Sequence, residues 1–131
     1  MDKTIIGTAT ILGLLSIILG AFGAHALKEV LTAEQLVSFE TGVRYQMYHA
    51  LFLLFVGTTS FLSAKQKKNV FWLTLIGVLF FSGSIYLLAT QPLSGISFKF
   101  LGPITPIGGL FLIIAWIVLF LSIIRQKTVN H

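Results

Sequence analysis

Residues 104–124 read ITPIGGLFLIIAWIVLFLSII, a stretch without a single Asp, Glu, Lys or Arg. A helix needs about 20 mainly apolar residues to cross the hydrocarbon core of a bilayer, and this stretch is long enough. Three further stretches have the same character and also lack these four residue types: Thr4–Ala24, Tyr45–Leu62 and Val70–Ala89. The sequence therefore predicts four membrane-spanning helices.

The composition supports this interpretation. Hydrophobic residues make up 56% of the 131 residues and charged residues only 10%, whereas a soluble domain is typically about 45–50% apolar and about 25% charged. The mean hydropathy is +0.94. This balance argues against a soluble enzyme, a disordered tail and a nucleic-acid-binding module. The chain has no cysteine, which excludes disulfides, a thiolate metal site and a cysteine nucleophile.

The first apolar stretch also resembles a signal peptide. It follows Lys3 and ends in Ala24-His25-Ala26, which fits the pattern of a cleavage site. A single Lys is a weak basic region, and cleavage would leave three spans. We therefore expect this segment to be retained as the first span.

The cations that flank the spans predict the orientation, because cytoplasmic loops carry an excess of Lys and Arg. One side carries six of them: Lys3, Lys65, Lys67, Lys68, Arg125 and Lys127. The other side carries three: Lys28, Arg44 and Lys99. We expect both termini in the cytoplasm of a bacterial cell, in its plasma membrane, with the loops 25–44 and 91–103 facing outward.

The connections predict the architecture. Ser63–Asn69 is a short, basic turn between spans two and three, and short connections join antiparallel neighbours. The expected fold is an all-α, four-helix membrane bundle of two hairpins, with residues 1–131 as a single domain. We expect span four to begin with Thr105 as its N-cap and Pro106 at the first helical position.

An amphipathic segment precedes the second span. Thr32 and Gln35 have the spacing of a capping box, and no proline follows before Leu62, so one helix could extend over about 45 Å. Because a bilayer core is only about 30 Å thick, the first turns either project outside or bend near Gly42 and lie along the membrane surface.

Small residues gather on two of the spans. They are Ser16, Gly20 and Ala24 in the first span, and Ser82, Gly83 and Ser84 in the third. Small residues let membrane helices approach closely. Two interpretations remain open here: packing within the bundle, which we favour, and a face for a homo-oligomer.

Seven residues form a candidate polar cluster at the outer ends of the first two spans: His25, Glu40, Arg44, Tyr45, Gln46, Tyr48 and His49. Glu40, Arg44 and Tyr48 are spaced by four residues, so they share one helix face, and Glu40 and Arg44 can form an ion pair. His49 lies about one turn inside the span, where an ionisable side chain needs a partner. Tyr86 and Gln91 are further candidates for this cluster, whereas Trp72 and Trp116 are expected to face lipid or to pack.

Three interpretations of the cluster compete. In the first it is structural, with the Glu40–Arg44 ion pair tying the helices together. In the second it is a ligand site, in which Arg44 holds an anionic group and Glu40 orients it. In the third, His25 and His49 act in catalysis or in metal or haem ligation, but the chain has no HExxH, G-x-S-x-G, phosphate-binding or dinucleotide-binding motif. We therefore expect no catalytic residues, no metal and no cofactor.

Four motifs carry a family resemblance. They are GAFGAHAL (20–27), TGVRYQMYHAL (41–51), FSGSIY (81–86) and GPITPIGG (102–109). With these motifs in this order, the chain resembles domain-of-unknown-function family 423, the YgdD/YwdK type of small bacterial membrane proteins, which is related to transmembrane protein 256. The resemblance implies a multi-spanning plasma-membrane protein without an established activity, and it supplies no catalytic residues.

The function predicted from these observations is that of a non-enzymatic integral membrane protein. Its role would be structural or would consist of binding lipids or a partner at the polar cluster, with membrane lipids and a second copy of the chain as the partners considered, and without nucleic acid. The alternative is a small oligomeric transporter or channel, although the spans contain no acid for proton coupling. A membrane enzyme comes third.

Overall fold

The computed structural model describes residues 1–125, and all of its regular elements are helical. They are α1 (Asp2–Ala24), η1 (Leu27–Glu29), α2 (Ala33–Thr58), α3 (Ala64–Val78), η2 (Leu79–Gly83), α4 (Ser84–Ala89), α5 (Gln91–Ser94), η3 (Lys99–Leu101) and α6 (Ile104–Arg125). The all-α class predicted from the sequence is confirmed. Lys127, one of the cations used to predict the orientation, lies outside the described residues.

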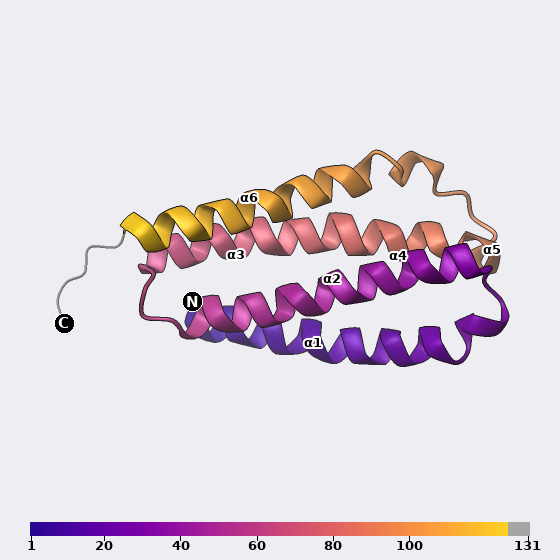
Figure 1. Ribbon diagram of the computed structural model, residues 1–131, viewed down its shortest axis with the longest axis horizontal. Helices are drawn as coiled ribbons and strands as arrows, with labels where there is room; N and C mark the ends of the chain where they lie inside the picture. The colour runs from indigo at the N-terminus through magenta and orange to yellow at the C-terminus, as the bar shows by residue number, and fades with distance from the viewer. Residues whose placement is uncertain (126–131) are drawn as a thin grey trace.

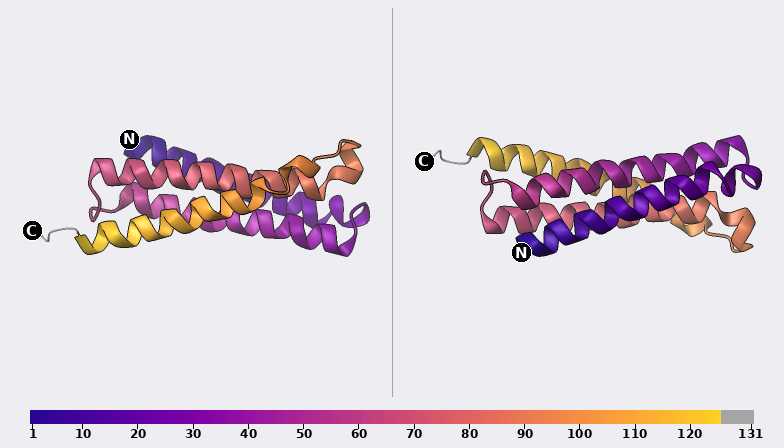
Figure 2. Two further views of the ribbon diagram at one scale, coloured as in Figure 1. Left: turned by 90° about the horizontal axis from the view of Figure 1, so that it is seen from above. Right: turned by 90° about the horizontal axis from the view of Figure 1, so that it is seen from below.

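The long helices lie side by side in the order α1, α2, α3 and α6, with η2 and α4 continuing α3 (Figure 1). The most extensive contacts join α1 to α2 and α3 to α6, and α2 also contacts α3, η2 and α4. In the two views of Figure 2, α1 and α6 lie on opposite sides of the molecule and cross the helices between them obliquely. The helices α2 and α3 therefore form the middle of the molecule.

The two ends of the molecule differ in their connections. At one end lie Met1, the connection 59–63 and Arg125; we call it the short-turn end. At the other end lie the connections 25–32 and 90–103; we call it the long-loop end. The first corresponds to the predicted cytoplasmic side and the second to the predicted outer side.

Three helical segments are long and apolar enough to cross a membrane: Asp2–Glu29, Ala64–Ala89 and Lys99–Arg125. They contain the predicted first, third and fourth spans. Helix α2 has 26 residues, but it carries Arg44, Gln46 and His49 and is not among the three. The four-span bundle of two hairpins therefore stays a prediction.

Capping side chains fix the beginnings of the two central helices. The predicted capping box of Thr32 and Gln35 is confirmed, with both of its hydrogen bonds present. A second capping box, formed by Ser63 and Gln66, begins α3 at Ala64. The predicted turn over Ser63–Asn69 is therefore wrong, because most of that segment belongs to the first turns of α3.

Two other predicted helix boundaries are also wrong. Helix α2 ends at Thr58 rather than at Leu62. There the Thr58 hydroxyl donates to the Leu54 carbonyl (2.7 Å), and such hydroxyls compete with backbone hydrogen bonds. Helix α6 begins at Ile104, so Thr105 is a first-turn residue rather than the N-cap, and its hydroxyl is hydrogen-bonded to that of Ser84.

The amphipathic start of α2 packs on the molecule without a break. Phe39 is buried with Leu27, Leu31 and Ala89 in a small apolar cluster at the long-loop end, and α2 is one uninterrupted helix through Gly42. Helix α2 is therefore continuous through Gly42, and its first turns pack against the rest of the molecule.

The small residues of α1 are only partly placed as predicted. Ser16 is buried and Gly20 lies against Val43, but Ala24 is exposed and Gly23 is buried in its place. A spacing of four residues drifts around the helix by about 40° per step, because one turn takes about 3.6 residues. The buried face therefore returns at Gly23, where a Cβ would lie only 3.1 Å from the ring of Phe39.

The third predicted span is not a regular α-helix throughout. Residues 79–83 (η2) form a π-helical segment, in which one residue more than usual occupies the turn. Gly108 of α6 lies directly against it, so that a Cβ there would overlap the backbone of Phe80 and Phe81. In this segment Ser82 is buried, whereas no other atom lies within 4 Å of the position where Gly83 would carry a Cβ.

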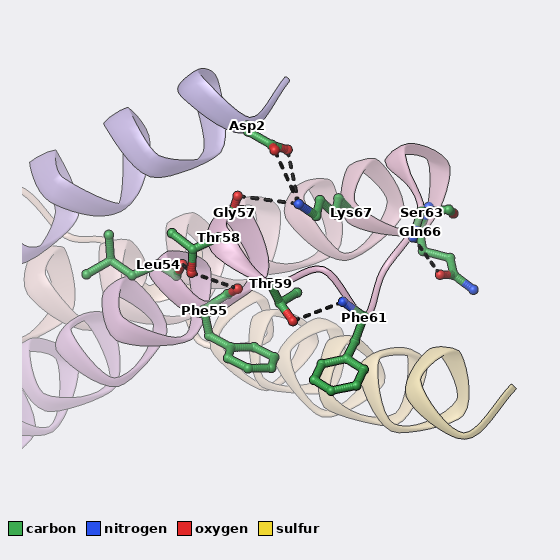
Figure 3. A network of polar contacts seen from close by, with 10 residues as sticks. All are labelled: Asp2, Leu54, Phe55, Gly57, Thr58, Thr59, Phe61, Ser63, Gln66 and Lys67. Atoms are coloured by element: carbon green, nitrogen blue, oxygen red, sulfur yellow. Dashed lines mark hydrogen bonds and ion pairs between the residues drawn. The ribbon is translucent and has the colours of Figure 1, made fainter. Parts of the chain in front are cut away.

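Lys67 holds three helices together at the short-turn end (Figure 3). Its Nζ lies 3.3 Å from both carboxylate oxygens of Asp2 in α1 and 3.4 Å from the carbonyl oxygen of Gly57 in α2. Lys67 is only 7% exposed, and within residues 1–125 this is the only ion pair. Lys67 is therefore not the solvated loop cation that the sequence suggested.

Candidate functional site

The residues of the predicted polar cluster fall into two groups at different depths. Gln46 and His49 are buried between helices, whereas His25, Glu40, Arg44, Tyr45 and Tyr48 are exposed. The structure thus separates the cluster into a buried part and a surface part.

Gln46 connects three helices through its side-chain amide. Its Nε2 donates to the carbonyl oxygen of Leu12 in α1 (2.9 Å), and its Oε1 accepts a hydrogen bond from the hydroxyl of Tyr86 in α4 (2.6 Å). Gln46 is 4% exposed, and a buried amide without partners would be costly. Within residues 1–125, one of the two Nε2 hydrogens of Gln46 has no partner. The hydrogen bonds from Gln46 to α1 and α4 fit a structural role.

Gly42 allows Tyr86 to approach α2. A Cβ at Gly42 would lie 2.8 Å from Cε1 of Tyr86, and the carbonyl of Gly42 accepts a hydrogen bond from Ser82 in η2 (2.7 Å). Tyr86, a further candidate in the sequence, therefore joins the buried part of the cluster. The other candidate, Gln91, instead accepts a hydrogen bond from the backbone amide of Phe98 (2.6 Å) and fixes the loop that follows α5.

His49 has a partner on each ring nitrogen. Nδ1 lies 2.7 Å from the carbonyl oxygen of Tyr45, and the indole of Trp116 donates to Nε2 (3.1 Å). Because a carbonyl only accepts and an indole N–H only donates, Nδ1 must carry the proton and Nε2 must be unprotonated. His49 is therefore a neutral imidazole with both nitrogens engaged, which leaves neither free to bind a metal or to accept a proton.

Trp116 has the exposure and the packing expected from the sequence, and it also donates a hydrogen bond that the sequence did not predict. It is half exposed, as expected of a lipid-facing residue, but its ring packs on Phe52 with 4.3 Å between the centroids, and its N–H is directed to His49. No local spacing links Trp116 to His49, since they are 67 residues apart. Only the expectation that His49 needs a partner pointed to such a residue.

Tyr45 and Tyr48 belong to an exposed aromatic surface of α2. Their ring centroids lie 5.4 Å apart, and that of Tyr45 lies 5.1 Å from that of Phe81. Such tilted aromatic pairs contribute modestly to packing. His25, at the end of α1, is exposed and has no side-chain hydrogen bond or ion pair within residues 1–125, so the structure does not bring it to His49.

Glu40 and Arg44 do not form the predicted ion pair, although both lie in the described part of the chain. Both are exposed, and an exposed pair at this spacing gains only about 0.3–0.5 kcal/mol, which the loss of side-chain freedom offsets. The two side chains instead line a cavity of about 310 Å³ together with Gly20, Phe39 and Val43. An acidic residue and an arginine therefore both line one cavity between α1 and α2.

No arrangement of three or more His, Cys, Asp or Glu residues suited to a metal ion exists within residues 1–125. The residues described above also include no nucleophile paired with a base. Gln46 and His49 hold helices together, and Glu40 and Arg44 present charge at the surface.

Comparison with known proteins identifies a family that the sequence of this chain matches. The family described as "Protein of unknown function (DUF423)" matches residues 19–109, a range that contains the whole polar cluster. No solved structure matches the chain.

Among its relatives, a UPF0382 membrane protein of Staphylococcus haemolyticus is 41% identical over 109 residues, which are 83% of this chain and 85% of the relative. UPF0382 membrane protein YwdK of Bacillus subtilis is 38% identical over 128 residues, which are 94% of this chain and 98% of the relative. UPF0382 inner membrane protein YgdD of Escherichia coli is 32% identical over 131 aligned positions, which cover 94% of this chain and 92% of the relative. The chain, with its three helices suited to a bilayer, is thus a membrane protein and belongs to the DUF423 family.

Proposed function

We propose that this protein is a non-enzymatic, single-domain, four-span protein of the bacterial plasma membrane, and that its long-loop end binds the head group of a membrane lipid between α1 and α2. The observation that carries the proposal is the cavity lined by both Glu40 and Arg44, which are exposed and not paired with each other.

The position of α2 supports a fourth span. It packs along α1 on one side and on α3 and α4 on the other, and α1 and α3 belong to segments suited to crossing the membrane. A helix between two spans lies at the same depth as they do. Its buried polar side chains have hydrogen-bond partners, which makes their presence in the bilayer tolerable.

The charges support an orientation with the short-turn end in the cytoplasm. Lys3, Lys65, Lys68 and Arg125 are all exposed at that end, as the excess of cations on cytoplasmic segments requires. The inner-membrane name of the relative YgdD supports the plasma membrane as the location.

The cavity at Arg44 has the chemistry of a lipid head group site. Gly20 lies one helical turn before the end of α1, so the cavity lies near the membrane surface. A guanidinium binds phosphate oxygens through two parallel hydrogen bonds, and Glu40 attracts an ammonium group. Together they match a zwitterionic head group that carries both charges, such as that of phosphatidylethanolamine, while Phe39 and Val43 contact its apolar part.

The interior gives less support to a transporter. The central apolar cluster of α1, α2, α3 and α6 fills the space between these helices, and Ser16 and Thr74 donate to carbonyls within their own helices (2.9 and 2.8 Å). A polar pathway along the molecule would need such groups to face a common channel.

Lipid retention tests the head group site. The full chain is purified in mild detergent and mixed with phosphatidylethanolamine, and bound lipid is measured by native mass spectrometry. We expect Arg44→Gln to lower the retained lipid about tenfold, since one charge-assisted hydrogen-bonded contact is worth about 1.5 kcal/mol, with an unchanged melting temperature. Lys28→Gln, a cation at the same end outside the cavity, is the control.

Two results would count against this site. Equal retention by Arg44→Gln and the control would show that the cavity is not the binding place. Similar losses of thermal stability in Arg44→Ala and Glu40→Ala would instead support a structural pair.

Labelling of introduced cysteines tests the orientation, because the chain has none of its own. Lys68→Cys should be protected from a membrane-impermeant maleimide in intact cells, and Lys99→Cys should react. Reaction at position 68 alone would reverse the proposed orientation.

A further inference from the structure

A second cavity lies at the opposite end of the molecule, between α3 and α6. It has a volume of about 410 Å³, and its polar lining includes Lys65, Gln66 and Asn69 from α3 and Ser122 and Arg125 from α6. None of these residues belongs to the predicted polar cluster. From this cavity we infer that the short-turn end holds a second lipid site, which takes the phosphate of an anionic glycerophospholipid.

The charge of this cavity has one sign. Lys65 and Arg125 are both exposed and lie on different helices, and no acidic side chain lines the cavity. Asp2, an acidic residue at the same end of the molecule, is paired with Lys67. Two cations without a counter-charge favour an anionic ligand, in contrast to the mixed charges at Glu40 and Arg44.

A buried hydroxyl in the cavity lacks a partner among residues 1–125. Ser122 is 7% exposed, and within residues 1–125 its Oγ makes no hydrogen bond. The other buried serine and threonine hydroxyls in the described helices have partners: Ser16 and Thr74 donate to the carbonyl four residues earlier, and Ser82 donates to the carbonyl of Gly42. A buried hydroxyl left without an acceptor is unfavourable, and an oxygen of a bound phosphodiester would supply that acceptor.

The length of the cavity along α6, and the order of the residues that line it, favour a lipid over free phosphate. Along α6 the lining runs from Val118 through Leu121 and Ser122 to Arg125, a rise of about 10 Å. The charged groups therefore lie at the helix ends, the serine in between, and the apolar residues toward the bilayer core. A head group, a glycerol backbone and the first acyl carbons follow one another in the same order.

The test compares two double variants of equal net charge in the full chain. Lys65→Gln/Arg125→Gln removes the two cations of the cavity, and Lys3→Gln/Lys68→Gln removes two exposed cations of the same end that do not line it. Each purified protein is titrated with dioleoyl-phosphatidylglycerol, and retention is followed by native mass spectrometry. The unmodified chain should retain one lipid at this site.

We expect the cavity double variant to retain phosphatidylglycerol about 30-fold more weakly, since each Lys or Arg near the surface contributes a factor of about five. The control double variant should retain it nearly as well as the unmodified chain. Ser122→Ala, which keeps both cations and is a small change in the packing, should weaken retention by a smaller factor. Arg44→Gln should leave phosphatidylglycerol retention unchanged, which separates this site from the one at the long-loop end.

Three outcomes would overturn the inference. Equal weakening in the two double variants would mean that only the overall charge matters. Unchanged retention in Ser122→Ala and in the cavity double variant would mean that the lipid binds elsewhere. Displacement of the lipid by millimolar inorganic phosphate would identify a site for a soluble anion instead.

Discussion

The short-turn end and the long-loop end of this molecule are built from different chemistry. At the short-turn end a buried lysine joins three helices to one another, and the cations around it have few acids to balance them. From the middle of the molecule toward the long-loop end the buried links are neutral, through Gln46, Tyr86 and Ser82, and the exposed charges at that end are mixed. The family match over residues 19–109 contains both Gln46 and Lys67, and it leaves out the part of α1 before residue 19 and the part of α6 after residue 109. The comparison teaches that the helices are joined by a charged link at one end and by neutral hydrogen bonds toward the other.

The largest effect is expected at the neutral links. Gln46→Leu would leave the Tyr86 hydroxyl without its acceptor and the Leu12 carbonyl without one of its donors. A lost partner at a buried polar group costs about 1–3 kcal/mol. We therefore expect the free energy of unfolding, measured by thermal unfolding in detergent, to fall by about 3 kcal/mol. Gln91→Leu, in the loop after α5, is the control.

A double-mutant cycle with Tyr86→Phe isolates this contact, because neighbouring groups do not act additively. The double variant should lose less stability than the sum of the single variants. Full additivity would show that the amide and the hydroxyl act independently.

A somewhat smaller effect is expected at Lys67. Lys67→Met removes the link between Asp2 and the end of α2. Breaking a fully buried pair costs about 3–5 kcal/mol, but the Asp2 side chain is 59% exposed and returns to solvent. We therefore expect a loss of about 1–2 kcal/mol by the same measurement. Lys68→Met, on the next position of α3, should change stability far less; an equal loss would mean that the ion pair contributes nothing specific.

Trp116→Phe should lower the free energy of unfolding by about 1 kcal/mol. The phenyl ring still packs on Phe52, but Nε2 of His49 loses its donor. Nitrogen chemical shifts of His49 should report the Nδ1-protonated form in the unmodified chain and a mixture of tautomers in the variant. A doubly protonated ring in the unmodified chain would contradict the assigned hydrogen bonds.

The smallest effect on stability is expected for the exposed charges of the long-loop end. Glu40→Ala and Arg44→Ala should each change the free energy of unfolding by no more than about 0.5 kcal/mol, because they are surface substitutions outside any ion pair. A loss as large as that of Lys67→Met would remove the distinction between the two ends.

The sequence predicted the helices better than the contacts between them. Long apolar stretches located the helices because burial in lipid depends on composition alone, and the capping box at Thr32 is a local signal that held. The partners of Gln46 lie 34 and 40 residues away in the chain, and only the stacking of α1, α2 and α4 brings them together.

Local spacing also gave wrong predictions for charged side chains, because their exposure to solvent determines whether they form ion pairs. Glu40 and Arg44 have the right separation for an ion pair, but both are solvated and remain apart. Lys67 looks like Lys65 and Lys68 in the sequence, yet it alone of the three is buried, because it lies on the same face of α3 as the buried Val70 and Phe71, and its partner Asp2 is 65 residues away.

The π-helical segment at residues 79–83 determines toward which side of the helix axis the side chains of α4 point. One additional residue in a turn rotates the later side chains by about 100° around the helix axis. Removal of one residue from this segment, with a return to a regular helix, would leave Tyr86 directed to Gln46, whereas a regular helix of unchanged length would turn Tyr86 away. This span should therefore tolerate the loss of one residue within 79–83 better than the loss of one residue elsewhere in α3.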